Sequence, residues 1–135
     1  MPKFSQSEAV SLAREKLIKS GCSEENYQGI TDGIIDAELS GIKSHGFHYL
    51  PIYCNHLKIG KIKGSAQASA ERLSDSALKI NADNGFAHNA INLGFGSLFD
   101  MCTTSGIASM SVFNSYNCGV LGFHTKRIAE KGFVG

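Results

Sequence analysis

The second half of the sequence alternates strand and helix patterns, and this order constrains the fold more than any other feature. Residues 77–81 alternate apolar and polar side chains, as a half-buried strand does. Asp-Asn-Gly at 83–85 predicts a turn, and apolar side chains at helical spacing follow over roughly 86–104. Residues 107–113 form the clearest strand pattern, and another helix is expected around 122–130. The strand–helix–strand–helix order predicts an α/β fold.

The first half of the sequence carries only helical patterns. Ser5 and Glu8 have the spacing of a capping box, which predicts a helix that starts at residue 6. Ser23 is the predicted N-cap of a second helix, and a third, short helix should carry Pro51 in its first turn. Residues 58–76 have no regular pattern and are predicted to form a solvated loop.

Composition narrows the class of protein. The 135 residues are 42% hydrophobic and 19% charged, which is typical of a globular domain with a real core. A net charge of +1 argues against a large nucleic-acid interface, and no apolar run is long enough to predict a membrane span. The four cysteines form no C-x-x-C pair, so we expect reduced, mostly buried thiols and a cytoplasmic location.

The loop between the second and third predicted helices gathers groups that can exchange protons or hydrogen bonds. It contains Ser44, His45, His48 and Tyr49 within six residues. Histidine titrates at about pH 6.5 and is the side chain most easily set to transfer protons near neutral pH. Gly46, which has no Cβ, would let a ligand or another backbone come close. A simple helix-connecting turn with incidental histidines is the competing interpretation.

A second polar stretch, residues 114–122, lies between the last predicted strand and the last predicted helix. Backbone N–H groups at the start of a helix can hold an anionic group such as a pyrophosphate. Gly119 and Gly122 would permit close approach of a ligand, although the stretch lacks the G-x-G-x-x-G pattern of a Rossmann fold. An ordinary strand-to-helix turn is equally consistent with these residues.

Ser44-His45-Gly46, followed by an apolar residue, a variable residue and, after Tyr49, Leu50-Pro51, resembles the signature of the type-2 malate/L-lactate dehydrogenases. Asp83-Asn84-Gly85, Asn114-Ser115 and the final Gly132-Phe133-Val134-Gly135 extend the resemblance over nearly the whole chain. Members of this family are oxidoreductases that use NAD or NADP on small 2-oxoacids and 2-hydroxyacids. Their fold is unrelated to that of the Rossmann-type lactate dehydrogenases.

The resemblance implies a role for each polar stretch. Ser44, His45 and Tyr49 become the catalytic candidates, with His45 as a donor to the substrate oxygen and Ser44 in the same relay. The cofactor would lie along Asn117, Cys118, Gly119, Val120 and Leu121.

The resemblance also implies an organisation of the chain. Residues 1–75 would form a helical region, and residues 76–135 would begin a mixed-sheet, non-Rossmann cofactor-binding domain. Family members are homodimers and much longer, so the chain is expected to be an N-terminal fragment that stops where a strand begins at 133–135.

Two departures from the family pattern put its activity in question. The family usually has arginine at the position of Tyr49 and histidine at the position of Asn117. Arginine grips a carboxylate with two hydrogen bonds, whereas tyrosine offers one neutral hydroxyl. Lys43 or His48 could supply positive charge instead. A cofactor-binding relative without catalytic activity is therefore a second hypothesis.

Two further clusters of polar residues are candidate sites. A histidine metal site formed by His45, His48 and His56 is a third hypothesis, although no nearby carboxylate and no i, i+4 histidine pair accompany it. The second predicted helix carries three carboxylates that we interpret as a solvated face, namely Asp32, Asp36 and Glu38.

Overall fold

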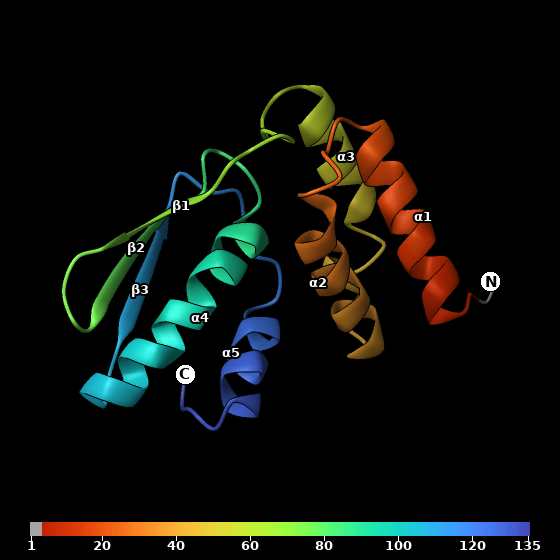
Figure 1. Cartoon of the computed structure of the whole chain (residues 1–135). Coiled ribbons are helices and arrows are strands. Elements are labelled where there is room, and N and C mark those ends of the chain that lie inside the picture. The colour runs from red at the N-terminus through yellow and green to blue at the C-terminus, as the bar shows by residue number, and fades with distance from the viewer. Residues whose placement is uncertain (1–3) are drawn as a thin grey trace.

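The computed structural model describes residues 4–135, and this part of the chain forms an α/β fold with a helical N-terminal segment, as predicted. Helices α1 to α3 lie together on one side, and a small sheet with α4 and α5 lies on the other (Figure 1). The elements are α1 (Gln6–Lys19), α2 (Tyr27–Leu39), the short 3₁₀-helix η1 (Lys43–His45), α3 (Leu50–Lys58), β1 (Ser69–Arg72), β2 (Ala77–Asn81), α4 (Ala87–Ser105), β3 (Ser109–Phe113) and α5 (Leu121–Glu130).

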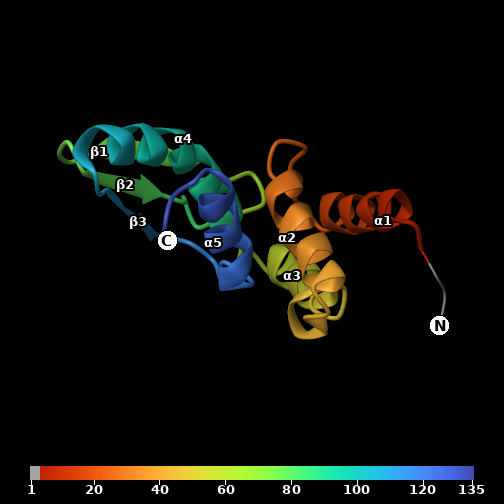
Figure 2. The same cartoon turned by 90° about the horizontal axis from the view of Figure 1, so that it is seen from below.

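The sheet is mixed, in agreement with the prediction, and its strand order is β1-β2-β3. Strand β1 runs antiparallel to β2, whereas β2 and β3 are parallel and are connected through α4. Helix α4 covers one face of the sheet, and α5 lies against α2, as Figure 2 shows from below. The parallel β2–α4–β3 unit brings the polar stretch after β3 next to the helical region.

The prediction of a loop over residues 58–76 is wrong in its second half, where β1 lies. All four residues of β1 are exposed, so the strand has no alternation of apolar and polar side chains. Its main-chain pairing with β2 makes it a strand, with Ser69 opposite Asn81. A pattern based on one buried face cannot detect such an edge strand.

Two predictions at chain turns are also wrong. Helix α2 starts at Tyr27 with Asn26, not Ser23, at the N-cap position. Ser23 lies one turn earlier, where its N–H donates to the carbonyl of Gly64 (3.0 Å). At the other end, residues 133–135 do not begin a strand. Phe133 donates its N–H to Ile128, which closes the end of α5. The predicted capping box of α1 is confirmed, since Ser5 and Glu8 bond to each other's backbone N–H.

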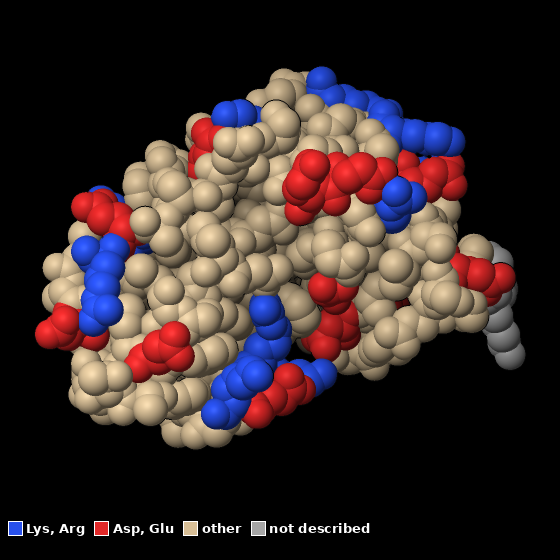
Figure 3. Space-filling model, viewed as in Figure 1, with Lys and Arg blue, Asp and Glu red and all other residues tan. Residues whose placement is uncertain are grey.

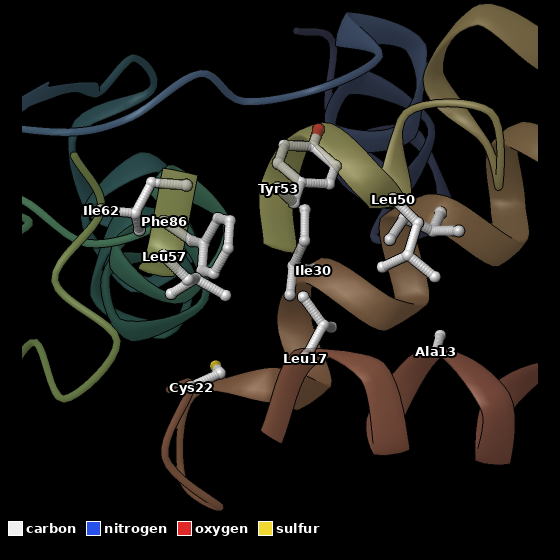
Figure 4. Close-up of a cluster of buried hydrophobic side chains, with 10 residues drawn as sticks. Ala13, Leu17, Cys22, Ile30, Leu50, Tyr53, Leu57, Ile62 and Phe86 are labelled. Atoms are coloured by element: carbon white, nitrogen blue, oxygen red, sulfur yellow. The ribbon is translucent and has the colours of Figure 1, made fainter. Parts of the chain in front are cut away.

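The helical region has its own hydrophobic core, shown in Figure 4. Ile30 lies there between Leu17 and the ring of Tyr53, and the hydroxyl of Tyr53 points away from both. Burying an apolar side chain of this size contributes about 1.5–3 kcal/mol. The core consists of Ala13, Leu17, Cys22, Ile30, Ile34, Leu50, Tyr53, Leu57, Ile62 and Phe86.

The second core lies between the sheet and α4, where Leu78 and Ile80 of β2 pack on Ala90 and Met101. Gly94 of α4 sits so close to the sheet that a Cβ would overlap the side chains of Met110 and Ile80. Close packing against the sheet therefore explains the glycine at this point of the helix. Gly96, by contrast, has open space around it, and Leu93 is 48% exposed.

The four cysteines are free thiols, but only Cys22 is buried, so the prediction of mostly buried thiols is wrong. Burial raises the pKa of the Cys22 thiol to about 12, which keeps it protonated.

The surface carries both signs of charge in the view of Figure 3, where basic and acidic side chains are interspersed. No helix within residues 4–135 is both long and apolar enough to span a bilayer.

Candidate functional site

The Ser-His-Gly loop places a serine hydroxyl directly on an imidazole. In η1, Ser44 Oγ lies 3.0 Å from His45 Nδ1. When the hydroxyl donates to Nδ1, the neutral ring carries its proton on Nε2. In that arrangement Nε2 has a proton to give to an oxygen atom.

Glu38 ties this loop to helix α2. Its Oε1 accepts the backbone N–H of Phe47 at 2.7 Å, and a Cβ on the buried Gly46 would overlap the same carboxylate. The expectation that Gly46 admits a ligand or another backbone is therefore corrected, because the Glu38 side chain occupies that space. Glu38 also does not belong to a purely solvated acidic face.

Tyr49 extends the loop toward the interior. Its ring stacks on His45 with centroids 6.1 Å apart and planes within 9°, and it meets the edge of Tyr53 at 4.7 Å. The stacking holds the His45 ring in one orientation without adding charge.

Tyr53 connects the two polar stretches that the sequence placed about 70 residues apart. Its hydroxyl donates to Oδ1 of Asn117 at 3.2 Å. Burial, reinforced by the neighbouring phenols of Tyr49 and Tyr116, raises the pKa of Tyr53, so the group stays a donor. A continuous path of contacts thus runs from His45 through Tyr49 and Tyr53 to Asn117.

Tyr116 lies beside this path and bonds to the third helix. Its hydroxyl is 2.6 Å from His56 Nδ1, and its ring packs on the edge of Tyr53. Burial and the adjacent Tyr49 hydroxyl raise the pKa of Tyr116 to about 12. Like Tyr53, it is a neutral hydrogen-bonding group near neutral pH.

The turn Asn117–Leu121 leads from β3 into α5. Gly119 adopts a φ of +66°, in the left-handed region that glycine tolerates best. Asn117 Oδ1 accepts the N–H of Gly119 at 3.3 Å, and His124 lies 2.8 Å from the carbonyl oxygen of Cys118. The turn is therefore held by side chains on both sides.

The start of α5 has the features of a site for an anionic group. No side chain among residues 4–135 caps this helix, and its first residues, Leu121 and Gly122, are exposed. Uncapped N–H groups and the helix dipole favour negative charge at such an end. The residues present thus fit the anionic phosphate part of a dinucleotide.

A sequence profile described as malate/L-lactate dehydrogenase matches residues 4–135. The chain belongs to this family.

Relatives in the family carry names of several reductases and dehydrogenases. A (2R)-3-sulfolactate dehydrogenase (NADP(+)) from Chromohalobacter salexigens is 31% identical over 94% of this chain and 38% of its own length. A Delta(1)-pyrroline-2-carboxylate reductase from Burkholderia ambifaria is 30% identical over 98% of this chain and 39% of its own. The chain therefore spans about two fifths of the length of these relatives.

Solved structures of the malate/L-lactate dehydrogenase family have the same fold. The delta1-piperideine-2-carboxylate reductase of Pseudomonas syringae superposes with a TM-score of 0.94 at 25% identity, covering 98% of this chain and 40% of that one. A malate dehydrogenase from Pyrococcus horikoshii gives 0.87 at 23% identity, covering 97% and 38%. The second likeness shows the fold alone.

The three histidines of the alternative metal site do not come together. His45 stacks on Tyr49, His56 bonds to Tyr116, and His48 is exposed. Within residues 4–135, no group of three histidine, cysteine or acidic side chains is arranged to hold a metal ion.

Each of the three arginines of the chain contacts residues outside the path from His45 to Asn117. Arg14 pairs with Glu24, Arg72 pairs with Asp75, and Arg127 lies between the rings of Phe95 and Phe123. The lysine that approaches the aromatic path is Lys61, whose Nζ lies 5.9 Å from the centre of the Tyr116 ring.

Sequence reasoning missed four residues that hold the site. The sequence pattern placed Glu38 on a solvated face, and Tyr53 was not singled out. His88 and His124, which are buried beneath the turn, were not singled out. Tyr53 could have been found, because it lies four residues after Tyr49 and so on the same helical face. An isolated histidine within a helix has no spacing signature.

Proposed function

We propose that the protein is an oxidoreductase that transfers a hydride between NAD(P)H and the carbonyl or hydroxyl carbon of a small 2-oxoacid or 2-hydroxyacid. The observation that carries this proposal is the contact path from His45 to Asn117, in a chain of the malate/L-lactate dehydrogenase family. It joins a proton donor to a turn suited to an anionic cofactor.

The nicotinamide cofactor, when bound, supplies or accepts the hydride. The residues of this chain donate the proton and orient the cofactor. Carbonyl reduction leaves negative charge on oxygen, which needs a donor at about 2.6–3.2 Å. His45 gives its Nε2 proton to that oxygen, Ser44 sets the tautomer, and Tyr49 holds the ring by stacking. The segment Asn117–Leu121 orients the cofactor and excludes water from one side of it.

The proposal includes the division of the chain into a helical region, 1–75, and the first part of a cofactor-binding domain, 76–135. It also includes a cytoplasmic homodimer whose partner molecules are small acids, with neither nucleic acid nor membrane. Free thiols support the cytoplasm, and family membership supports the dimer. The interspersed charges on the face seen in Figure 3 argue against nucleic acid. Light scattering of the purified protein tests the dimer.

The experiment is an assay of the naturally expressed protein with NADH and NADPH against a panel of 2-oxoacids and cyclic imino acids. We expect turnover with at least one substrate, and a loss of about 10²–10⁴-fold in kcat for His45→Ala, the usual contribution of a general acid. Exposed Ser40, changed to alanine just before the loop, serves as the control for a general disturbance of this segment.

A second function, cofactor binding without turnover, is favoured by one observation. Tyr49 and Asn117 replace the arginine and the histidine usual in the family, and the arginines of this chain contact other residues. Tight NAD(P)H binding with no turnover on the whole panel would support this function and contradict the first.

A further inference from the structure

Two buried histidines that the proposed reaction does not use lie beneath the turn Asn117–Leu121. His88, at the start of α4, is 1% exposed, and His124, on α5, is 8% exposed. Their ring centroids are 5.3 Å apart. Buried imidazoles without an evident partner are uncommon, so the contacts of these two rings indicate what they do.

His124 makes one hydrogen bond, and it goes to the turn. Its Nε2 lies 2.8 Å from the carbonyl oxygen of Cys118. A carbonyl can only accept, so the ring donates from Nε2, while the buried Nδ1 has no partner among the described residues. Because the peptide unit is planar and trans, the N–H of Gly119 points away from His124. Oδ1 of Asn117 accepts that N–H on the other side.

His88 fills a space that two glycines leave open. A Cβ on Gly33 of α2 would lie 2.7 Å from His88 Nε2, and a Cβ on Gly119 would lie 3.1 Å from it. The ring of His88 is thus wedged between helix α2 and the turn. Any larger side chain at either glycine would push the ring away.

The pair is kept neutral by its surroundings. Burial, the adjacent His124 and the guanidinium of Arg127 lower the pKa of His88 to about 3. Burial is also the main cause of the lowered pKa of His124; the hydrogen bond to Cys118 acts against it, and Arg127 acts in the same direction as burial. Asp32 on α2 acts on Arg127 rather than on either ring. A neutral His124 keeps one bare nitrogen and one fixed donor, which the bond to Cys118 uses.

We propose that His88 and His124 are positioning residues that hold the turn Asn117–Leu121 in the conformation that binds the cofactor. His124 acts through its hydrogen bond to Cys118, and His88 acts by filling the space beside Gly33 and Gly119. The inference rests on the proposed function, because it assigns the turn to NAD(P)H.

The test compares His124→Gln with His124→Leu in the naturally expressed protein. Glutamine keeps an N–H donor at a similar reach and does not titrate, whereas leucine keeps the bulk and removes the donor. The first readout is hydrogen exchange of the backbone amides of residues 117–121 without cofactor. The second is the Kd for NADH and NADPH from fluorescence titration.

We expect His124→Leu to exchange these amides about fivefold faster and to bind the cofactor about fivefold more weakly, as loss of one neutral hydrogen bond implies. His124→Gln should stay within twofold of the unaltered protein in both readouts. His88→Ala should also speed exchange, and Glu130→Gln, at the exposed far end of α5, is the control.

Unchanged exchange at residues 117–121 in His124→Leu would overturn the positioning role. Faster exchange with an unchanged Kd would overturn its link to the cofactor. If the unaltered protein binds neither NADH nor NADPH, the proposed function fails together with that link. The exchange measurement would then still decide whether His124 holds the turn.

Discussion

The two halves of the proposed site are built in opposite ways. The Ser44–His45 loop is partly exposed and is tied down by one carboxylate, that of Glu38. The turn Asn117–Leu121 rests on two buried neutral rings, His88 and His124. A group that gives and takes protons has to stay in contact with solvent or substrate, whereas a surface that orients a cofactor gains from a rigid, uncharged support. Tyr53 connects the two.

Acidification should have the largest effect on stability, and this effect arises from the two histidines that support the turn. The pKa of His88 is lowered to about 3 in the folded chain, against about 6.5 when unfolded. Below pH 6.5 the unfolded chain takes up the proton and the folded chain does not, so stability falls as pH falls toward 3, by up to about 1.4 kcal/mol per pH unit. His124, shifted in the same direction, adds to the loss.

Urea unfolding midpoints measured from pH 7.5 to 4.5 check this effect, with His88→Gln as the comparison. The glutamine variant should show a flatter dependence on pH even if it is less stable overall. An equally steep dependence in both proteins would show that His88 is not the group responsible.

Gly46→Ala should have the next largest effect, on the loop side. The new Cβ would displace the Glu38 carboxylate and break its bond to the Phe47 N–H. Hydrogen bonds to charged groups contribute about 1.5–3 kcal/mol, so we expect a destabilisation of about 2 kcal/mol in chemical denaturation.

The double variant Gly46→Ala with Glu38→Ala provides the control for that prediction. The clash disappears once the carboxylate is gone, so Gly46→Ala should add almost nothing to the destabilisation caused by Glu38→Ala alone. Fully additive losses would contradict the contact.

Tyr53→Phe should have the smallest effect of the three, because it removes only the hydroxyl that joins the halves. Loss of its bond to Asn117 should lower the free energy of unfolding by about 1 kcal/mol. A double-mutant cycle with Asn117→Ala isolates the coupling between the two side chains. A coupling energy near zero would mean that the two halves are merely adjacent.

The sequence predicted those parts of the fold that depend on local patterns. Strand β2 alternates over its whole length, and the Ser5 capping box spans only four residues. Strand β1 and the start of α2 depend on partners far along the chain, which a local pattern does not contain.

The candidate site shows the same limit. Family motifs led to His45 and to Asn117, and the roles proposed for them stay predictions. The residues that connect or support them were missed because their roles arise from tertiary contacts. Tyr53 donates to Asn117, which lies 64 positions further along the chain, and His88 of α4 lies beside Gly119 in the turn before α5.

Side-by-side measurement of kcat and of the Kd for NAD(P)H in His45→Ala and Gly119→Ala tests the central claim most directly. Gly119 has a φ of +66°, where a Cβ costs about 1–2 kcal/mol, and that Cβ would also press on His88. The account predicts that His45→Ala loses turnover at an unchanged Kd, and that Gly119→Ala weakens cofactor binding roughly tenfold. Equal losses of Kd in both variants, or full turnover in His45→Ala, would contradict the division of work between the loop and the turn.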